Sequence, residues 1–352
     1  MGTHGPRRLG PVGEITVGII GAGSWGTTVA SLMATKTRAV LWARRPALAE
    51  AISRTHENPP YLKGLPLPGS LVATASLREA VSGAGVVLMA VPSHGFRSVL
   101  TDLLPSLAPG VPIVSLAKGI ESGSHLRMSE IVAELAPDNP AGVLTGPNLA
   151  REVAEGQPAA SVVALRDADE AARIQELLHT RTFRVYTGSD VVGCEIAGAT
   201  KNVMAIAAGI CDGLGLGENT RAVLITRGLA ELARLGVTLG GQALTFGGLA
   251  GVGDLVATCA SPNSRNRTVG FELGRGRSLG EIVGGMRMVA EGVKTAGPLL
   301  GLARAHDVEM PIVEQVEAIV GGRRSPRDAL VALMDRPARP EWDEALLRGG
   351  SG

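Results

Sequence analysis

Aromatic residues are scarce in this chain of 352 residues, in which phenylalanine, tryptophan and tyrosine together make up 3%. Basic residues form no contiguous run longer than two, and the formal net charge is only +1. Proteins that bind nucleic acids need a basic groove, and those that bind single strands add aromatic platforms on which bases stack. The composition therefore predicts no nucleic-acid partner.

Cysteine is also rare. The three cysteines, Cys194, Cys211 and Cys259, are odd in number and lack the paired spacing of a disulfide framework or a thiolate metal site. We therefore expect no metal centre, and a reducing, cytoplasmic location.

Apolar runs long enough for a targeting or membrane segment are missing as well. Residues 1–13 are polar and rich in glycine and proline, without an apolar core of signal-peptide length. We expect residues 1–14 to be a disordered extension. A long uncharged stretch, residues 236–253, contains so many glycines that it indicates loops between short helices. No membrane span is predicted.

A glycine-rich turn follows the first apolar segment. Residues 15–20 read as a β-branched strand, Gly21-Ala-Gly23-Ser-Trp-Gly26 as a tight turn, and residues 27–34 as a helix. In this context Gly21 permits the turn, Gly23 lets a pyrophosphate approach the backbone, and Gly26 allows close packing of helix on strand. We expect a dinucleotide site, the alternative being a glycine turn without a ligand.

Two arginines close the second expected strand, residues 39–42. A strict NAD site places an acidic residue here to bind the ribose 2′-hydroxyl, whereas Arg44 and Arg45 suit a 2′-phosphate or the adenine ring. NADP should therefore be accepted. The alternative is a solvated helix start at Pro46, and Tyr61, in the loop beyond, could be only a hydrophobic anchor.

Strands and helices continue to alternate up to about residue 190. Further strands are expected at the positions listed here: residues 86–91, 112–116, 143–144, 161–164 and 183–186. This alternation predicts an α/β, Rossmann-type doubly wound sheet that binds its ligands at the carboxyl ends of the strands. Lys118 follows such a strand directly and is a candidate to contact substrate, whereas His94 at a helix start is better explained as structural.

The remainder predicts an all-helical domain over residues 191–335, after a dinucleotide-binding domain over 15–190 and before a flexible tail over 336–352. Its first helix carries Lys201 on a face with Ala197, Gly198 and Ala205, side chains too small to shield an ammonium. Burial there removes hydration that favours the charged lysine, which suits proton exchange near neutrality. The alternative is a lysine that reaches out of a packed Ala/Gly helix.

Two further clusters lie in the helical domain. Asp254 ends the run Gly251-Val-Gly-Asp and could be a functional carboxylate or only a helix N-cap. Ser264, Arg265 and Asn266 gather a hydroxyl, a guanidinium and an amide at a helix start, which suits a phosphate monoester, although a bare capping cluster would have the same pattern.

Taken together, these motifs resemble those of the bacterial NAD(P)-dependent glycerol-3-phosphate dehydrogenases. The similar stretches extend over residues 15–335 and are most specific at Gly193 to Asn202, Gly248 to Asp254 and Ser264 to Asn266. The resemblance implies that Lys201 is the proton acceptor and that NADP or NAD is the cofactor. It also implies a role in supplying the phospholipid backbone, and a homodimer.

The resemblance also assigns residues to the two ligands. Around glycerol 3-phosphate or dihydroxyacetone phosphate it places Lys118, Gly146, Asn148, Lys201, Asp254, Ser264, Arg265 and Asn266. Around the cofactor it adds Ser24, Trp25, Arg44, Arg45, Tyr61, Lys118, Ala150, Arg265, Val289 and Glu291 to the three glycines of the turn. The family commonly has Gly-Pro-Ser-Phe-Ala where this chain has Gly146-Pro-Asn-Leu-Ala150, so the contact at Asn148 is open.

Two other functions remain compatible with the residues. A two-domain β-hydroxyacid dehydrogenase would also use a lysine on the first helix of its second domain, but it would act on a carboxylate and not need a phosphate cluster. A nucleotide-sensing protein without turnover would keep only the dinucleotide site.

Overall fold

The computed structural model describes residues 15–286, 290–338 and 340–341. Two compact units account for them. The first comprises residues up to Ala117 together with Met128–Leu144 and Asn148–Val191, and the second comprises Lys118–Arg127, Thr145–Pro147 and the chain from Val192 onward. The expected boundary near residue 190 had left residues 118–127 and 145–147 in the first domain, whereas their contacts group them with the second.

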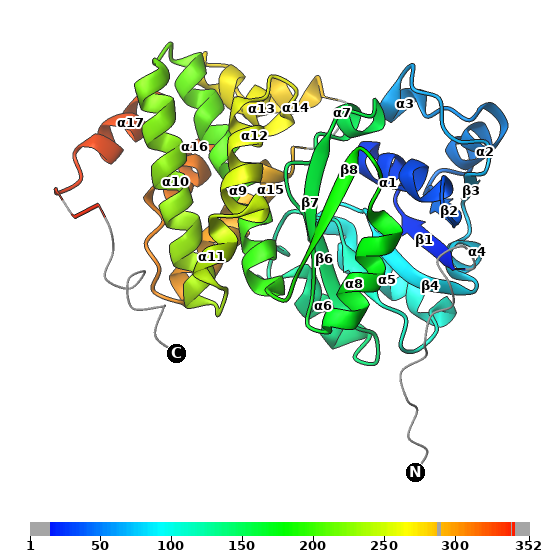
Figure 1. Ribbon diagram of the computed structural model, residues 1–352. Helices are drawn as coiled ribbons and strands as arrows, with labels where there is room; N and C mark the ends of the chain where they lie inside the picture. Colours follow the sequence, from blue (N-terminus) through cyan, green and yellow to red (C-terminus); the bar gives the residue numbers. More distant parts are fainter. Residues whose placement is uncertain (1–14, 287–289, 339, 342–352) are drawn as a thin grey trace. The chain divides into compact units, whose positions relative to one another are not determined.

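The first unit is built on an eight-stranded sheet of order β3-β2-β1-β4-β5-β6-β7-β8 (Figure 1). The strands are β1 Thr16–Ile20, β2 Arg38–Trp42, β3 Val72–Thr74, β4 Ala84–Met89, β5 Ile113–Ser115, β6 Ala141–Thr145, β7 Ala159–Leu165 and β8 Phe183–Gly188. Neighbours from β3 through β6 pair in parallel, as do β7 and β8. The order of the first six strands is that of a doubly wound dinucleotide fold, so the predicted α/β class is confirmed.

Buried β-branched residues explain why the central strands form. Val17, Ile19 and Ile20 of β1 are fully buried, as is Val87 of β4. Strands covered by helices on both faces carry such uninterrupted apolar runs. The three-residue β3 was not predicted from the sequence, because a run that short has no period to detect.

Helices α1 Ser24–Ala34 and α8 Ala168–Leu178 contact one another on the sheet, and α5 Ser93–Leu103 contacts α6 Met128–Leu135. The other helices of this unit are α2 Pro46–Thr55, α3 Pro59–Leu62, α4 Leu77–Val81, η2 Leu104–Ser106 and α7 Ala150–Ala154. The apolar pattern of residues 125–135 predicts a helix from His125, but α6 begins only at Met128, because His125 has a left-handed backbone with φ of 60°.

Apart from Thr145, the last residue of β6, the regular secondary structure described in the second unit is helical. Its helices are α9 Val191–Gly213, α10 Glu218–Thr238, α11 Ala243–Phe246, η3 Leu249–Gly253, α12 Asp254–Ala260, α13 Arg265–Gly274, α14 Leu279–Gly284, α15 Glu291–Ala305, α16 Pro311–Val320 and α17 Pro326–Met334. Glycines let α9 and α13 touch backbone to backbone, since a Cβ on Gly270 would lie 1.9 Å from the carbonyl oxygen of Ile206. This contact fixes the middle of α13 relative to α9.

Two stretches are long and apolar enough to cross a membrane by length and composition alone. The first is α9, whose most apolar window is 94% buried inside the protein, as expected of a core helix. The second, Ala243–Ala260, is divided among α11, η3 and α12 and contains the buried Asp254. Neither is a clear membrane span.

Candidate active site

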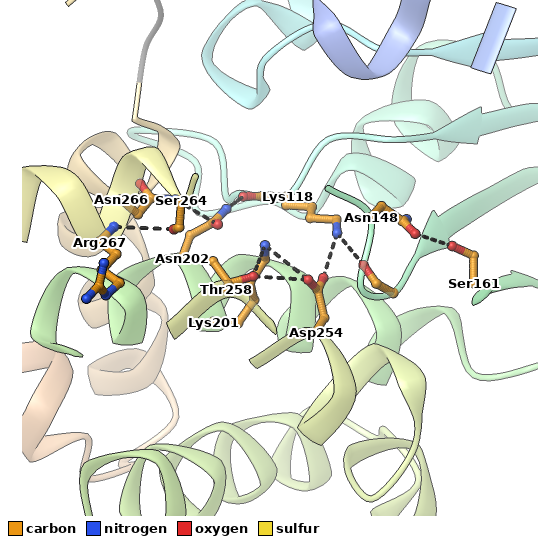
Figure 2. Close-up of polar contacts among 11 residues, drawn as sticks. Lys118, Asn148, Ser161, Lys201, Asn202, Asp254, Thr258, Ser264, Asn266 and Arg267 are labelled. Atoms are coloured by element: carbon orange, nitrogen blue, oxygen red, sulfur yellow. Dashed lines mark hydrogen bonds and ion pairs between the residues drawn. The ribbon is translucent and has the colours of Figure 1, made fainter. Parts of the chain in front are cut away.

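Two lysines of the helical unit share one carboxylate (Figure 2). The Nζ of Lys118 lies 2.6 Å from Oδ2 of Asp254, and the Nζ of Lys201 lies 3.2 Å from Oδ1. The Lys118 ammonium also donates to the carbonyl oxygen of Gly146 at 2.9 Å. All three charged side chains are at most 12% exposed. The alternative reading of Asp254 as a helix cap fails, since Gly253 holds the cap position and the carboxylate binds the lysines.

Burial and mutual charge shift the ionisation of this cluster. Burial lowers the pKa of Lys118 to about 8, and the attraction of Asp254 offsets this only in part. Burial would raise the pKa of Asp254, but the neighbouring Lys118 and Lys201 outweigh it and hold that pKa below its usual value. The cluster therefore combines a firmly ionised carboxylate with at least one lysine that can lose its proton in mildly alkaline solution.

Thr258 completes the group and was not identified from the sequence. Its hydroxyl accepts a hydrogen bond from the Lys201 ammonium at 2.8 Å and donates to Oδ1 of Asp254 at 3.2 Å. Thr258 follows Asp254 by four residues on α12, so both side chains lie on one face of that helix. That spacing was the signal in the sequence that could have identified Thr258.

A chain of amide hydrogen bonds runs from Lys118 toward the expected phosphate cluster. The Nδ2 of Asn202 donates to the carbonyl oxygen of Lys118 at 2.9 Å, and the Nδ2 of Asn266 donates to Oδ1 of Asn202 at 2.9 Å. The Oδ1 of Asn266 accepts the backbone N–H of Gly292 at 3.0 Å. Asn202, which sequence reasoning did not assign to the site, therefore ties three segments of this unit together.

The phosphate cluster itself lies at the start of a ten-residue helix. Ser264 is the N-cap of α13, and its hydroxyl accepts the backbone N–H of Arg267 at 3.3 Å. Asn266 is buried, and Arg265 is exposed as the first residue of the helix. The capping role of Ser264 is therefore real, and the positive end of the helix, with the exposed Arg265 as its first residue, is a setting that suits an anion.

In the sheet unit, the glycine turn has the shape that a dinucleotide needs. Gly21 has φ of 123°, and a Cβ on Gly26 would lie 1.9 Å from the carbonyl oxygen of Gly21. A Cβ on Gly23 would meet nothing within 4 Å, so the loop faces open space there. Gly23 is the N-cap of α1 and supplies no side-chain cap, so the first N–H groups of α1 can receive a phosphate.

Side chains around this turn fall into two groups. Arg44 and Arg45 are exposed, and neither guanidinium has a hydrogen-bond or ion-pair partner in the described part of the chain. Trp25 instead packs edge-to-face on Phe183, with ring centroids 5.9 Å apart. The Ser24 hydroxyl donates to the carbonyl oxygen of Tyr61 at 3.0 Å, which anchors α3 beside the turn.

The other expected residues have these positions. In the sheet unit, Oδ1 of Asn148 accepts the Ser161 hydroxyl at 2.5 Å, while its Nδ2 is buried without a partner among the described residues. The carbonyl oxygen of Ala150 accepts the Thr28 hydroxyl at 3.0 Å. In the helical unit, Glu291 is the first residue of α15, and its charge acts on Lys118. Val289 lies outside the described residues.

Metal-ligating side chains are not grouped in the described ranges, where no three His, Cys, Asp or Glu residues could hold an ion together. Cys194 and Cys259 are buried, and burial raises the pKa of the Cys259 thiol to about 12. A buried thiol with so high a pKa is a poor nucleophile.

Comparison with protein families covers both units. The family model described as NAD-dependent glycerol-3-phosphate dehydrogenase N-terminus matches residues 16–171, and the corresponding C-terminus model matches residues 190–331. The chain belongs to the NAD-dependent glycerol-3-phosphate dehydrogenase family. The dehydrogenase is accordingly an NAD(P)-dependent oxidoreductase acting on glycerol 3-phosphate, as the sequence motifs predicted.

Individual relatives agree. Glycerol-3-phosphate dehydrogenase (NAD(P)+) 2 of Sphingopyxis alaskensis is 51% identical over 321 residues, which cover 91% of this chain and 96% of that protein. The enzyme of Thermobifida fusca is 50% identical over 329 residues, covering 92% and 98%. The crystal structure of glycerol-3-phosphate dehydrogenase from Coxiella burnetii superimposes with a TM-score of 0.88 at 38% identity, covering 93% of this chain and all of that one.

Proposed function

We propose that Lys201 is the proton donor and acceptor in the interconversion of dihydroxyacetone phosphate and glycerol 3-phosphate. The observation that carries this proposal is the buried cluster of Lys118, Lys201, Asp254 and Thr258. Lys201 donates to Thr258 and lies against Asp254, which leaves its third N–H for a substrate oxygen. In reduction, the ammonium protonates the oxygen on carbon 2. In oxidation, the neutral amine accepts that proton.

Lys118 and Asp254 have a supporting role in this proposal. The Lys118 ammonium donates hydrogen bonds to the carbonyl oxygen of Gly146 and to Asp254. Its third N–H donates to the substrate oxygen and so orients that oxygen toward Lys201. Two ammonium groups and one carboxylate leave a net charge of +1, which attracts a phosphorylated substrate. Asp254 keeps the two ammonium groups from repelling each other where little water can screen them.

Phosphate binding would come from the start of α13. Arg265 can supply a bidentate guanidinium, and Asn266 still has a second Nδ2 hydrogen after its bond to Asn202. These groups lie away from the reacting carbon, so their binding energy would serve to orient the substrate.

Most cofactor residues of the proposal lie in the sheet unit, around the turn from Gly21 to Gly26. When bound, NADP or NAD supplies the hydride acceptor or donor. The open backbone at Gly23 and the uncapped start of α1 fit its pyrophosphate, and Arg44 and Arg45 fit a 2′-phosphate. The proposal also keeps the expected cofactor contacts of Glu291, Ala150, Tyr61 and Val289. It keeps the expected contact of Asn148 with substrate.

The cellular setting is also proposed. The family resemblance supports net formation of glycerol 3-phosphate for phospholipid synthesis, a cytoplasmic location and a homodimer. Analytical ultracentrifugation of the purified chain would test the dimer directly, because the measured mass of a monomer would be half that of a dimer.

The proposed reaction is tested by following NADPH oxidation with dihydroxyacetone phosphate beside unphosphorylated dihydroxyacetone and a set of 3-oxo acids. Turnover with the phosphate ester alone supports the proposal. Preference for a keto acid would favour the β-hydroxyacid dehydrogenase alternative. Tight NADPH binding with no turnover would favour a nucleotide sensor.

A further inference from the structure

One face of α9 is the support for the segment that carries Lys118. Glu195, Gly198 and Asn202 are spaced by three and four residues, so their side-chain positions line one side of the helix. Each of them meets the segment Lys118–Arg127, which belongs to the helical unit although it follows strand β5 in the sequence. The helix that carries Lys201 therefore also holds the other lysine of the cluster.

The first attachment is at Lys118 itself. The Nδ2 of Asn202 donates to the carbonyl oxygen of Lys118 at 2.9 Å. Gly198 has no side chain, which leaves room for the side chain of Lys118. A Cβ on Gly198 would lie 3.4 Å from Cγ of Lys118 and 3.3 Å from the hydroxyl oxygen of Thr145. The aliphatic part of Lys118 therefore lies directly against the backbone of α9.

The second attachment is an ion pair at the far end of the segment. Nη1 of Arg127 lies 2.8 Å from Oε2 of Glu195, with side chains only 13% and 4% exposed. Such a charge-assisted bond is short and directional, and removing one partner would leave the other charge buried. Glu195 precedes Lys201 by six residues, or roughly 9 Å along the helix at 1.5 Å per residue, so the pair is too distant to act on substrate directly.

Between its two attachments the segment forms a closed turn. The backbone N–H of Glu121 donates to the carbonyl oxygen of Leu126 at 3.0 Å, and that of His125 donates to Glu121 at 3.2 Å. The His125 ring lies so close to α15 that a Cβ on Gly301 would be 2.6 Å from it. A turn held in this way transmits a displacement at Arg127 to Lys118.

We propose that the ion pair between Arg127 and Glu195 is a positioning element of the active site, which holds Lys118 at the correct distance from Asp254 and Lys201. Arg127 and Glu195 are positioning residues, acting through Lys118 and touching neither substrate nor cofactor. The inference rests on the proposed role of Lys118 in orienting substrate. It extends that role to two residues outside the predicted site.

The test is a double-mutant cycle between Arg127 and Lys118. Arg127→Met should lower kcat/KM for dihydroxyacetone phosphate by roughly 10- to 100-fold, the cost of small misplacements of a catalytic group. Arg127→Lys should restore part of the loss. In a Lys118→Ala background, Arg127→Met should lower kcat/KM by no more than about twofold, because the group it positions is gone. Arg304→Met, which removes an exposed ion pair to Glu314 in the same unit, is the matched control and should leave kcat/KM unchanged.

The outcomes separate this inference from the proposed function. If Arg127→Met lowers kcat/KM equally with and without Lys118, the pair acts on something other than Lys118 and the inference is wrong. If Lys118→Ala alone leaves kcat/KM unchanged, the proposed role of Lys118 is wrong instead. Should Arg127→Met fail to fold, Glu195→Gln, which keeps the shape of the side chain, takes its place in the same cycle with the same two readings.

Discussion

The Lys118 ammonium donates a hydrogen bond to Oδ2 of Asp254, with 2.6 Å between the two atoms. The two residues are 136 positions apart in the sequence. Because Asp254 also binds Lys201, a change in the charge of either lysine acts on the other through the shared carboxylate. The pH dependence of the enzyme should therefore report on this cluster.

The first prediction concerns Lys118 and pH. Burial lowers its pKa to about 8, so its ammonium is present below that pH and is lost as the pH rises through it. If the charged form orients substrate, kcat/KM for dihydroxyacetone phosphate should fall by up to about tenfold per pH unit above that value. Lys118→Arg should have a lower kcat/KM that depends less on pH in this range, because guanidinium stays charged. An arginine variant with the same alkaline decline as the parent would assign the titration to another group.

Cofactor preference should depend on the arginines after β2. Arg44 and Arg45 are exposed and have no side-chain partner in the described ranges, so a 2′-phosphate would provide their counter-charge. Replacing both with alanine should raise KM for NADPH by roughly 10-fold or more, from the loss of charged hydrogen bonds, with a much smaller effect on KM for NADH. Steady-state kinetics with both cofactors measure this directly. Equal effects on the two would remove the role in 2′-phosphate binding.

Phosphate recognition should depend on Arg265. Arg265→Ala should weaken dihydroxyacetone phosphate binding by about 1.5–3 kcal/mol, the usual contribution of a charged hydrogen bond. Arg265→Lys should restore only part, because the bidentate fork is lost. NADPH affinity must be measured separately by fluorescence titration, since the same residue is expected near the cofactor. A parent enzyme equally active on unphosphorylated dihydroxyacetone would rule out the phosphate site.

A buried glutamate away from this site should affect stability. Glu231 of α10 accepts the backbone N–H groups of Ile312 at 2.7 Å and Val313 at 3.3 Å, and so caps α16. Burial nevertheless raises the pKa of this carboxyl to about 7 from 4.5. Between these two values the folded protein keeps a proton that the unfolded chain has released, so this group contributes more stability as the pH falls from about 7 to 4.5.

Glu231→Gln should remove that dependence. The free energy of unfolding of the parent should rise relative to that of the variant by roughly 2–3 kcal/mol between pH 8 and pH 5, because about two pH units of this range lie below the folded pKa of about 7. Urea denaturation at several pH values measures it, with Glu314→Gln, a half-exposed carboxyl on α16, as the control. Parallel stability curves for parent and variant would contradict the raised pKa.

Local chemistry decided which features could be predicted from the sequence. The turn from Gly21 to Gly26 was recognisable because its backbone geometry demands glycine at fixed spacing between a strand and a helix. The sheet followed from the alternation of apolar strands and helices. The three-residue β3 and the left-handed His125 have no periodic pattern, and neither was predicted.

Long-range pairing accounts for the rest. The sequence identified Lys118, Lys201 and Asp254 as separate candidates, but nothing in it showed that the carboxylate bridges the two lysines. The pair of Arg127 and Glu195 spans 68 residues, so periodicity within one helix could not reveal it. The sequence showed that α9 has a face of small residues. That this face supports Lys118 could not be predicted, because it depends on how residues 118–127 pack against the helix.

Lys201 provides the decisive test of the proposed chemistry, and the variants must separate its charge from its proton. Lys201→Met keeps the length of the side chain without the amine, and it should lower kcat by roughly 10²- to 10⁴-fold, the usual cost of losing a general acid or base. NADPH binding should change little, because the dinucleotide turn belongs to the other unit. Lys201→Arg keeps a positive charge beside Asp254 but cannot readily release a proton, so it should recover little of the lost kcat. Lys36→Met, at an exposed lysine of the sheet unit, is the control and should keep full activity. An arginine variant as active as the parent would show that the lysine contributes charge alone and that the proton moves through another group, for which the Thr258 hydroxyl, 2.8 Å from Nζ, is the nearest candidate.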